Sequence, residues 1–265
     1  MLKINFKHPE YFIQDVFLYT NFKSLINYIC TMSKNFLFYI LCCFVGSSFA
    51  QEETANDTTN VDLNYREDQF YISVTYNLLN NKPTDVSQSG FSSGFHFGFI
   101  RDMPLNEKRD FAIGLGLGLS SNSYNQNMLI QKDNTNQFTY TVIDKSVDAF
   151  KKNKFTTYLV EMPLEFRWRK STPTDYTFWR VYTGFKVGYV IHSSSKYKGD
   201  LGSVKTSGID DIEKLQYGLT LSAGYSTWNF HVYYGLNPIF KNSAIIDGKA
   251  IDTSNIKIGL MFYIL

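Results

Sequence analysis

Six charged side chains fall on one parity of the apolar, strand-like segments in the second half of the chain: Glu161, Glu165, Arg167, Arg180, Lys186 and Lys257. Successive side chains of a β-strand point to opposite faces, so all six are expected on the same face of a sheet. If that sheet closes into a barrel, they face its interior. An unpaired buried charge is strongly destabilising, so these groups are expected to pair.

Paired charges and a transport pathway are the two chemistries that this pattern allows. Glu161 and Glu165 lie on one segment, and Arg180 and Lys186 lie on the next, so the two signs are neighbours in the predicted sheet. The interior of a barrel of eight strands is just wide enough for side chains to fill. We therefore predict a structural network of ion pairs in the lumen, rather than a channel lined by charges.

Catalytic and metal-binding residues are not predicted. His192-Ser193-Ser194 is the one candidate for a nucleophile and base at the outer end of a segment, but no Asp or Glu is placed to orient the base. His96 and His231 fall at inward positions and are interpreted as hydrogen-bonding residues of the interior. No Cys/His or clustered Asp pattern suggests a metal, and no cofactor site is expected.

Eight alternating segments must position these residues. Their ranges are 69–78, 91–99, 111–119, 156–169, 179–189, 215–225, 230–237 and 256–264. Each has bulky apolar residues on one parity and small or polar residues on the other, as in strands with one face toward lipid. An even count of such segments predicts an all-β, eight-stranded, antiparallel, up-and-down transmembrane β-barrel, which forms the domain 69–265.

The segment Phe111–Leu119 shows the pattern most clearly, because Gly or Ala alternates with a bulky residue at every position. A soluble sheet would instead match its apolar face with polar residues. The bare face predicts room in the lumen for the long charged side chains of other strands. Gly114-x-Gly116 is not a nucleotide-binding loop, since no third Gly follows and the strand pattern continues.

Connector lengths predict the orientation. The links after the second, fourth and sixth segments are short, and the others are longer, up to 121–155. Short links are typical of periplasmic turns, so both termini are expected in the periplasm. Within the longest link, 128–130 and 138–142 are expected to extend the third and fourth strands as a hairpin, the main outward contact surface.

Composition agrees with a barrel of this kind. Aromatic residues make up 17% of the chain, and a mean hydropathy of -0.21 excludes a bundle of membrane helices. The net charge of +2 comes without a basic stripe, so no nucleic-acid partner is expected.

The amino-terminal part is interpreted as processing signal. Residues 1–31 are predicted to be an upstream over-extension of the gene start, 32–50 a signal peptide cleaved after Ala50, and 51–68 a flexible periplasmic leader. All three cysteines, Cys30, Cys42 and Cys43, precede the cleavage site. Lipidation of Cys42 is not expected, because it requires a small residue just before the cysteine and Leu41 stands there. The predicted location is the cell outer membrane, with its lipid as a partner.

Several runs resemble the PorT-type outer-membrane barrels of Bacteroidota: Tyr65–Tyr71, Gly94–Asp102, Glu161–Arg169, Phe178–Lys186, Leu215–Thr220 and Ile258–Tyr263. The resemblance covers nearly all of 65–265, and Glu161–Arg169 and Phe178–Lys186 are its most specific parts. It implies a non-enzymatic accessory component of type IX protein secretion, which acts through contacts with secretion-system proteins. The alternative is a general small barrel of the porin family, serving envelope integrity, adhesion or small-solute passage.

Overall fold

The computed structural model describes residues 67–144, 146–170 and 178–264. These belong to one compact unit, 61–265. The predicted gene-start extension, the signal peptide with its cleavage site, and most of the leader lie outside the described residues.

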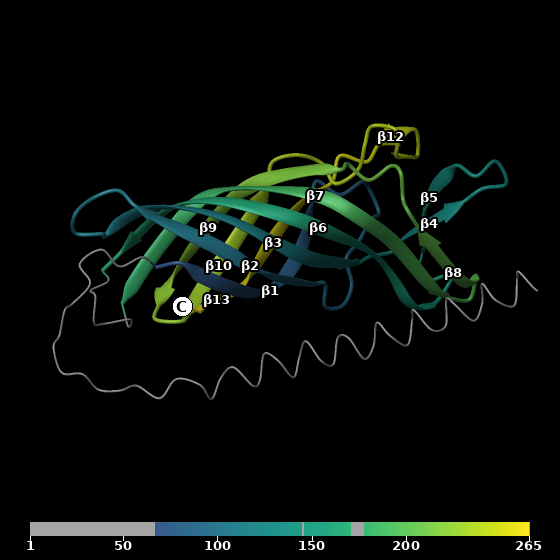
Figure 1. Ribbon diagram of the computed structural model, residues 1–265. Helices are drawn as coiled ribbons and strands as arrows, with labels where there is room; N and C mark the ends of the chain where they lie inside the picture. The colour runs from purple at the N-terminus through teal and green to yellow at the C-terminus, as the bar shows by residue number, and fades with distance from the viewer. Residues whose placement is uncertain (1–66, 145, 171–177, 265) are drawn as a thin grey trace, which may run out of the picture. The chain divides into compact units, whose positions relative to one another are not determined.

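Eight strands form a closed antiparallel ring (Figure 1). In ring order they run β6-β3-β2-β1-β13-β10-β9-β7, and the pairing of β6 with β7 closes the ring. Their bounds are β1 Gln69–Asn80, β2 Ser93–Pro104, β3 Phe111–Asn125, β6 Phe150–Arg169, β7 Trp179–Gly199, β9 Leu215–Tyr225, β10 Trp228–Gly235 and β13 Ser254–Ile264. The predicted fold class is therefore confirmed. Closure pairs the backbone groups of every strand, as lipid surroundings require.

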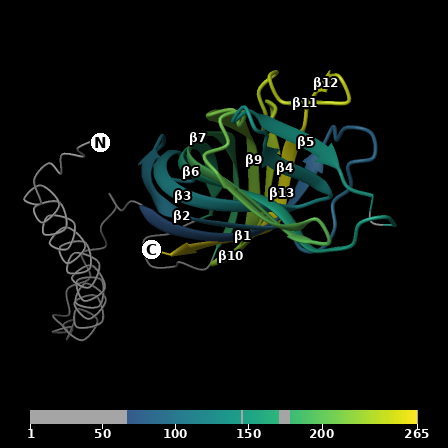
Figure 2. The same ribbon diagram turned by 90° about the vertical axis from the view of Figure 1, so that its right-hand side faces the viewer.

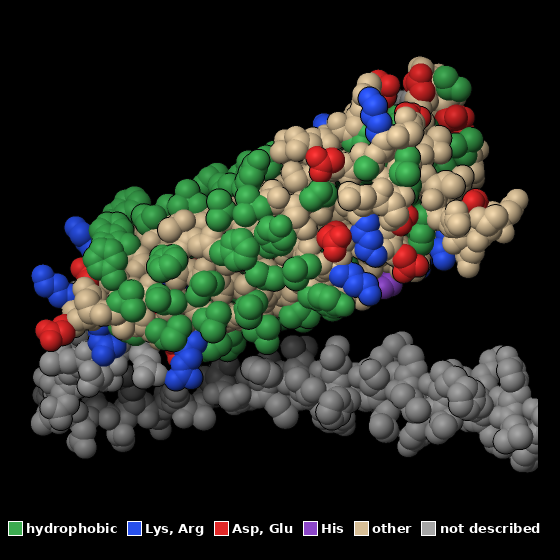
Figure 3. Space-filling model, turned by 90° about the horizontal axis from the view of Figure 1, so that it is seen from above, with side chains coloured by type: hydrophobic (Ala, Val, Ile, Leu, Met, Phe, Trp, Pro, Cys, Tyr) green, Lys and Arg blue, Asp and Glu red, His purple; other side chains and the backbone are tan. Residues whose placement is uncertain are grey.

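The alternation of side chains gives the barrel an apolar outside and a polar inside. On β3, Leu117 is 64% exposed, whereas its neighbours Gly116 and Gly118 are buried. Figure 3 shows apolar side chains covering the middle of the barrel wall, with charged groups gathered toward its two ends. All three tryptophans, Trp168, Trp179 and Trp228, are exposed at the end that carries the short turns. Aromatic girdles of this kind mark the membrane interfaces of outer-membrane barrels.

Short strands gather at the opposite end of the barrel (Figure 2). They are β4 Met128–Lys132, β5 Phe138–Val142, β8 Gly202–Ser207, β11 Ile245–Ile246 and β12 Lys249–Ala250. β8 pairs with the distal part of β7, while β4 pairs only with β5 in a separate two-stranded sheet. The expected hairpin thus exists, but it does not extend the third and fourth barrel strands, which reach Asn125 and begin at Phe150 by themselves.

An apolar cluster closes this end of the barrel. Its buried members come from strand ends and from all four long links: Leu79, Val86, Tyr124, Met128, Ile130, Tyr140, Phe155, Leu159, Val190, Ile209, Ile212, Ile239, Phe240, Ala244, Ile246 and Ile251. We call it the apolar cap. Phe155, fully buried, stacks on Tyr124 at 4.8 Å between ring centroids and meets Phe240 edge-on at 5.4 Å. The links therefore pack over the barrel mouth, as core residues pack in a soluble domain.

Candidate functional site

The interior of the barrel is filled with side chains. Glycines on β3 leave room for long residues from elsewhere: an added Cβ at Gly114 would lie 2.6 Å from Nε of Arg167, and one at Gly118 would collide with the hydroxyl of Tyr71. The bare inner face of β3 thus accommodates a guanidinium and a phenol. The polar groups that remain form two clusters, one in the middle of the barrel and one near the short turns.

Glu161 is the centre of the middle cluster. Its Oε2 lies 3.0 Å from Nδ1 of His96 and 3.4 Å from Nζ of Lys186, and its Oε1 lies 3.9 Å from Nζ of Lys257. Ser120 donates a hydrogen bond to Oε1 at 2.8 Å. The ammonium group of Lys257 also lies 4.8 Å from the ring centroid of Tyr233. One carboxylate thus connects four other strands across the lumen, and all of these groups are buried.

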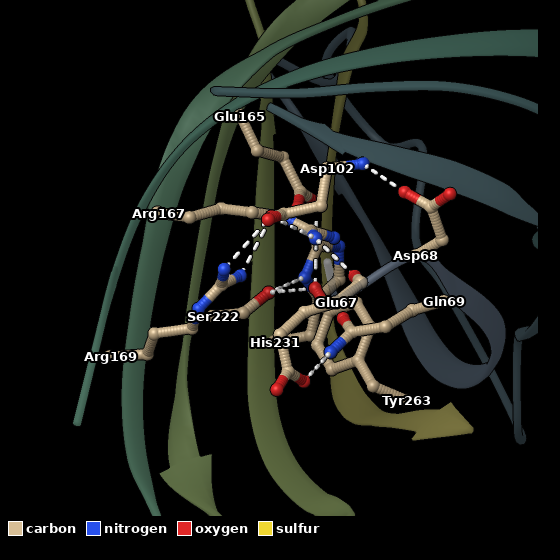
Figure 4. Close-up of polar contacts among 10 residues, drawn as sticks. All are labelled: Glu67, Asp68, Gln69, Asp102, Glu165, Arg167, Arg169, Ser222, His231 and Tyr263. Carbon is tan, nitrogen blue, oxygen red and sulfur yellow. Dashed lines mark hydrogen bonds and ion pairs between the residues drawn. The ribbon is translucent and has the colours of Figure 1, made fainter. Parts of the chain in front are cut away.

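Asp102 is the centre of the second cluster (Figure 4). It accepts two hydrogen bonds from Arg169, at 2.7 and 2.6 Å, and one from Arg167 at 3.1 Å. Nε of Arg167 also bonds to Glu165 at 3.1 Å, and the guanidinium lies 4.6 Å from the ring centroid of Tyr182. A buried charge is tolerated when ionic and hydrogen-bonding partners satisfy it in this way.

Arg180 differs from the other predicted residues. Pairing between β6 and β7 places it opposite Arg169, while Glu165 faces Gly184. Its guanidinium lies 4.5 Å from the ring centroid of Phe178 and 5.7 Å from that of Tyr263. Its Nε and Nη1 have no hydrogen-bond partner among the residues that the structure describes. Aromatic rings therefore surround this guanidinium, and the buried carboxylate of Glu67 supplies an opposite charge nearby, although no direct ion pair to Arg180 occurs among the described residues.

The structure therefore divides the six predicted residues between two places. Glu161, Lys186 and Lys257 meet in the middle of the barrel, whereas Glu165 and Arg167 meet near the short turns, with Arg180 beside them. Sequence reasoning missed the partners His96 and Asp102. The sequence predicts His96 in the interior without naming its partner, and Asp102 lies outside the eight predicted segments. Inward parity was the available signal for Asp102, because it lies six residues after His96 on the same strand.

The last residues of the predicted leader also enter the barrel. Glu67 is fully buried, and its backbone oxygen accepts a hydrogen bond from Arg167 at 3.4 Å. Asp68 accepts one from the backbone NH of Asp102 at 2.7 Å. These contacts join the chain just before β1 to the Asp102 cluster.

The candidate nucleophile segment lies at an irregularity. His192 and Ile191 are both exposed, because the register between β6 and β7 shifts where Tyr158 pairs with His192 and Leu159 with Val190. Ser193 bonds to the backbone of Ile209 instead of to His192. His231 bonds to Ser222 at 2.7 Å inside the barrel. No group of His, Cys, Asp and Glu suited to a metal ion occurs in the described ranges. No helix long and apolar enough to cross a membrane occurs in them either.

Residues 49–241 match the family described as "Outer membrane protein beta-barrel domain". This chain belongs to that family. The outer membrane is therefore where the protein resides, and its exposed apolar band contacts the lipid. The match begins before β1 and extends through β10, so it includes both clusters of the interior except for the residues of β13.

Solved structures similar to this outer-membrane barrel include Ail, the attachment invasion locus protein of Yersinia pestis. The identity is 13% and the TM-score 0.35, over 74% of this chain and 97% of Ail. For the structure of Ail in complex with the heparin analogue sucrose octasulfate, the sequence identity is 11% and the TM-score 0.33, over 75% of this chain and 99% of Ail. No curated protein matches the sequence.

Proposed function

We propose that this barrel is a non-enzymatic accessory component of type IX protein secretion, and that it acts through contacts with partner proteins rather than through its lumen. The proposal that the barrel does not act through its lumen rests on one observation, the occupied interior. Glu161 and Asp102 each hold several charged partners across the lumen, and the apolar cap covers the mouth. The secretion role rests on the resemblance of Glu161–Arg169 and Phe178–Lys186 to PorT-type barrels.

The orientation belongs to the same proposal. We infer that the short turns face the periplasm and the long links face the cell exterior, as is usual for outer-membrane barrels. The long links expose apolar side chains that do not belong to the cap: Val147 is 75% exposed, Leu201 52% and Ile245 53%. Exposed apolar residues on a protein surface suit contact with another protein.

Deletion of the gene tests the role in secretion. If the proposal holds, cargo of the type IX system disappears from the medium, while resistance of the envelope to detergent is unchanged. Normal secretion together with sensitivity to detergent would instead favour a general envelope role. Complementation with Val147→Asp, Leu201→Asp and Ile245→Asp combined should restore the barrel to the membrane without restoring secretion.

Passage of small solutes is tested in planar bilayers. A filled lumen predicts no steady conductance from the purified protein. Stable, porin-like single-channel currents would contradict a function outside the lumen.

A further inference from the structure

Five lysines gather on the outer face of three neighbouring strands, beyond the apolar band. Register pairs Lys154 with Lys196 and Lys152 with Lys198 across β6 and β7, and it pairs Lys196 with Lys205 across β7 and β8. Four of them are exposed, and Lys154 is half-buried. We call this set the lysine row.

Like charges placed directly opposite one another on a sheet are destabilising. No ion pair to any of the five lysines occurs among the residues that the structure describes. The residues that flank the row in register are Ser194, Ser203, Ser207 and Thr156, which are uncharged. An anion from outside the chain would relieve this repulsion.

The apolar band of the barrel shows where the lysine row lies relative to the membrane. Exposed residues of β6 run from Trp168 to Tyr158, which spans about 33 Å along the strand and about 25 Å across the membrane at a tilt of ~40°. Lys154 lies four residues beyond Tyr158, hence roughly 10 Å above the band. Polar headgroups occupy about 5–8 Å on each side of the hydrocarbon, and a lysine side chain can extend back toward them.

A cleft adjoins the row. It has a volume of about 480 Å³ and is lined by Lys151, Lys152 and Lys154 together with Asn125, Asn153, Phe150, Ser89 and Gly90. Asparagine and serine side chains supply hydrogen-bond donors beside the ammonium groups, a combination that suits phosphate and sugar oxygens.

We propose that the lysine row and this cleft bind the phosphate groups of a phosphorylated glycolipid in the outer leaflet of the outer membrane. The inference rests on the proposed orientation, with the long links outside the cell. The site would hold the lipid beside β6 and β7, separate from the exposed apolar residues proposed to contact partner proteins.

Binding to a defined lipid tests the proposal. The purified mature barrel is placed in phosphatidylcholine nanodiscs that contain fluorescent bis-phosphorylated lipid A, and the dissociation constant is measured. The variant is Lys154→Gln, Lys196→Gln and Lys205→Gln combined. The matched control removes three charges elsewhere, with Lys82→Gln, Lys108→Gln and Lys249→Gln combined. One lysine near an anionic surface contributes about fivefold in affinity, so the first variant should bind at least roughly tenfold more weakly, and the control should bind as the wild type does.

Three outcomes would overturn the proposal: unchanged binding of dephosphorylated lipid A, equal loss in both variants, or a soluble phosphorylated disaccharide that binds as tightly as the lipid. A third variant, with arginine at the same three positions, should retain binding, which separates loss of charge from loss of folding. Heat-modifiability in gels verifies that every variant is folded.

The orientation is examined separately. Because the mature chain is expected to lack cysteine, Asn134→Cys can be labelled on intact cells by a reagent that does not cross the membrane; Asn134 is exposed at the turn between β4 and β5 and does not belong to the residues proposed to contact partner proteins. Labelling supports the external position of the row, and absence of labelling overturns it. Neither this result nor lipid binding by the purified barrel depends on secretion partners, so failure of the secretion role would be recognised independently.

Discussion

Arg169 and Asp102 form a bidentate ion pair inside the barrel, with two hydrogen bonds of 2.7 and 2.6 Å and both side chains fully buried. Arg167 shares the same carboxylate. Removal of one partner from such a group leaves uncompensated charge in a medium of low polarity. We therefore expect Asp102→Asn to lower the free energy of unfolding by about 3–5 kcal/mol. The free energy of unfolding is measured from tryptophan fluorescence as a function of urea concentration in detergent micelles. Asp252→Asn, at an exposed position, is the control, and an equal effect of the two would contradict the argument.

Phe155 connects the links of the apolar cap. Phe155→Ala removes its contacts with Tyr124 and Phe240 and should cost about 3–5 kcal/mol, because the site is fully buried. The cap should loosen before the barrel, so cleavage by protease within 126–149 is expected to accelerate. Phe155→Leu retains most of the volume and should cost less than about 1.5 kcal/mol. Unchanged protease resistance of the alanine variant would show that the cap does not depend on this ring.

Leu117 points into lipid near the middle of the apolar band. An arginine there places charge in hydrocarbon, so Leu117→Arg should lower stability by about 2–4 kcal/mol. Leu201→Arg makes the same replacement at an exposed turn beyond the band, where water solvates the charge. Heat-modifiability gels compare the two. If both variants melt together, the apolar band does not face lipid as described.

Tyr140 and Asp211 connect the β4–β5 hairpin to the link before β9. The hydroxyl donates a hydrogen bond to Asp211 at 3.0 Å. Burial, assisted by the nearby carboxylate, raises the pKa of Tyr140. The phenol therefore stays protonated in the folded cap at a pH at which the unfolded chain has ionised. Its contribution to stability is complete below about pH 10, the ordinary tyrosine pKa, and is lost as pH rises above it.

Protease sensitivity of the hairpin should accordingly stay unchanged from about pH 8 to about pH 10 and rise above about pH 10. In Tyr140→Phe this dependence should be weaker, because the titrating group is absent. Alkaline difference spectra of wild type against variant report the ionisation itself. Equal pH profiles of the two proteins would assign the effect to other groups.

The strands could be predicted from the sequence because a lipid-facing wall imposes a period of two. Where one face of a strand meets lipid and the other a crowded lumen, as at Leu117 between two buried glycines, the residue type alone shows which side chains point outward and which point inward. The division of inward charges into two clusters could not be predicted in this way. It depends on register, and the register places Arg180 opposite Arg169 instead of opposite a glutamate.

The apolar cap was beyond sequence reasoning for a different reason. Phe155 lies near the start of β6 and Phe240 lies in the link after β10, so no common period relates them, and only the closed ring brings them together. The longest link, with its hairpin of 128–130 and 138–142, is predicted from the sequence to be the main outward contact surface. Instead, buried residues such as Ile130 and Tyr140 point into the cap, which leaves a smaller outer surface at exposed side chains such as Val147.

Pairing of the first barrel strand with the last joins the two ends of the barrel sequence. Phe70 lies opposite Ile264, whereas the other neighbours in the ring follow one another along the chain apart from the short strands of the links. Seven of the eight pairings thus join barrel strands that follow one another along the chain, and the ring stays open until the eighth, between β1 and β13, has formed. Until then β1 and β13 each present an open edge that can pair with another chain. A truncation within 254–264 should consequently produce aggregates rather than a smaller barrel, and the unfinished protein depends on protection of those two edges.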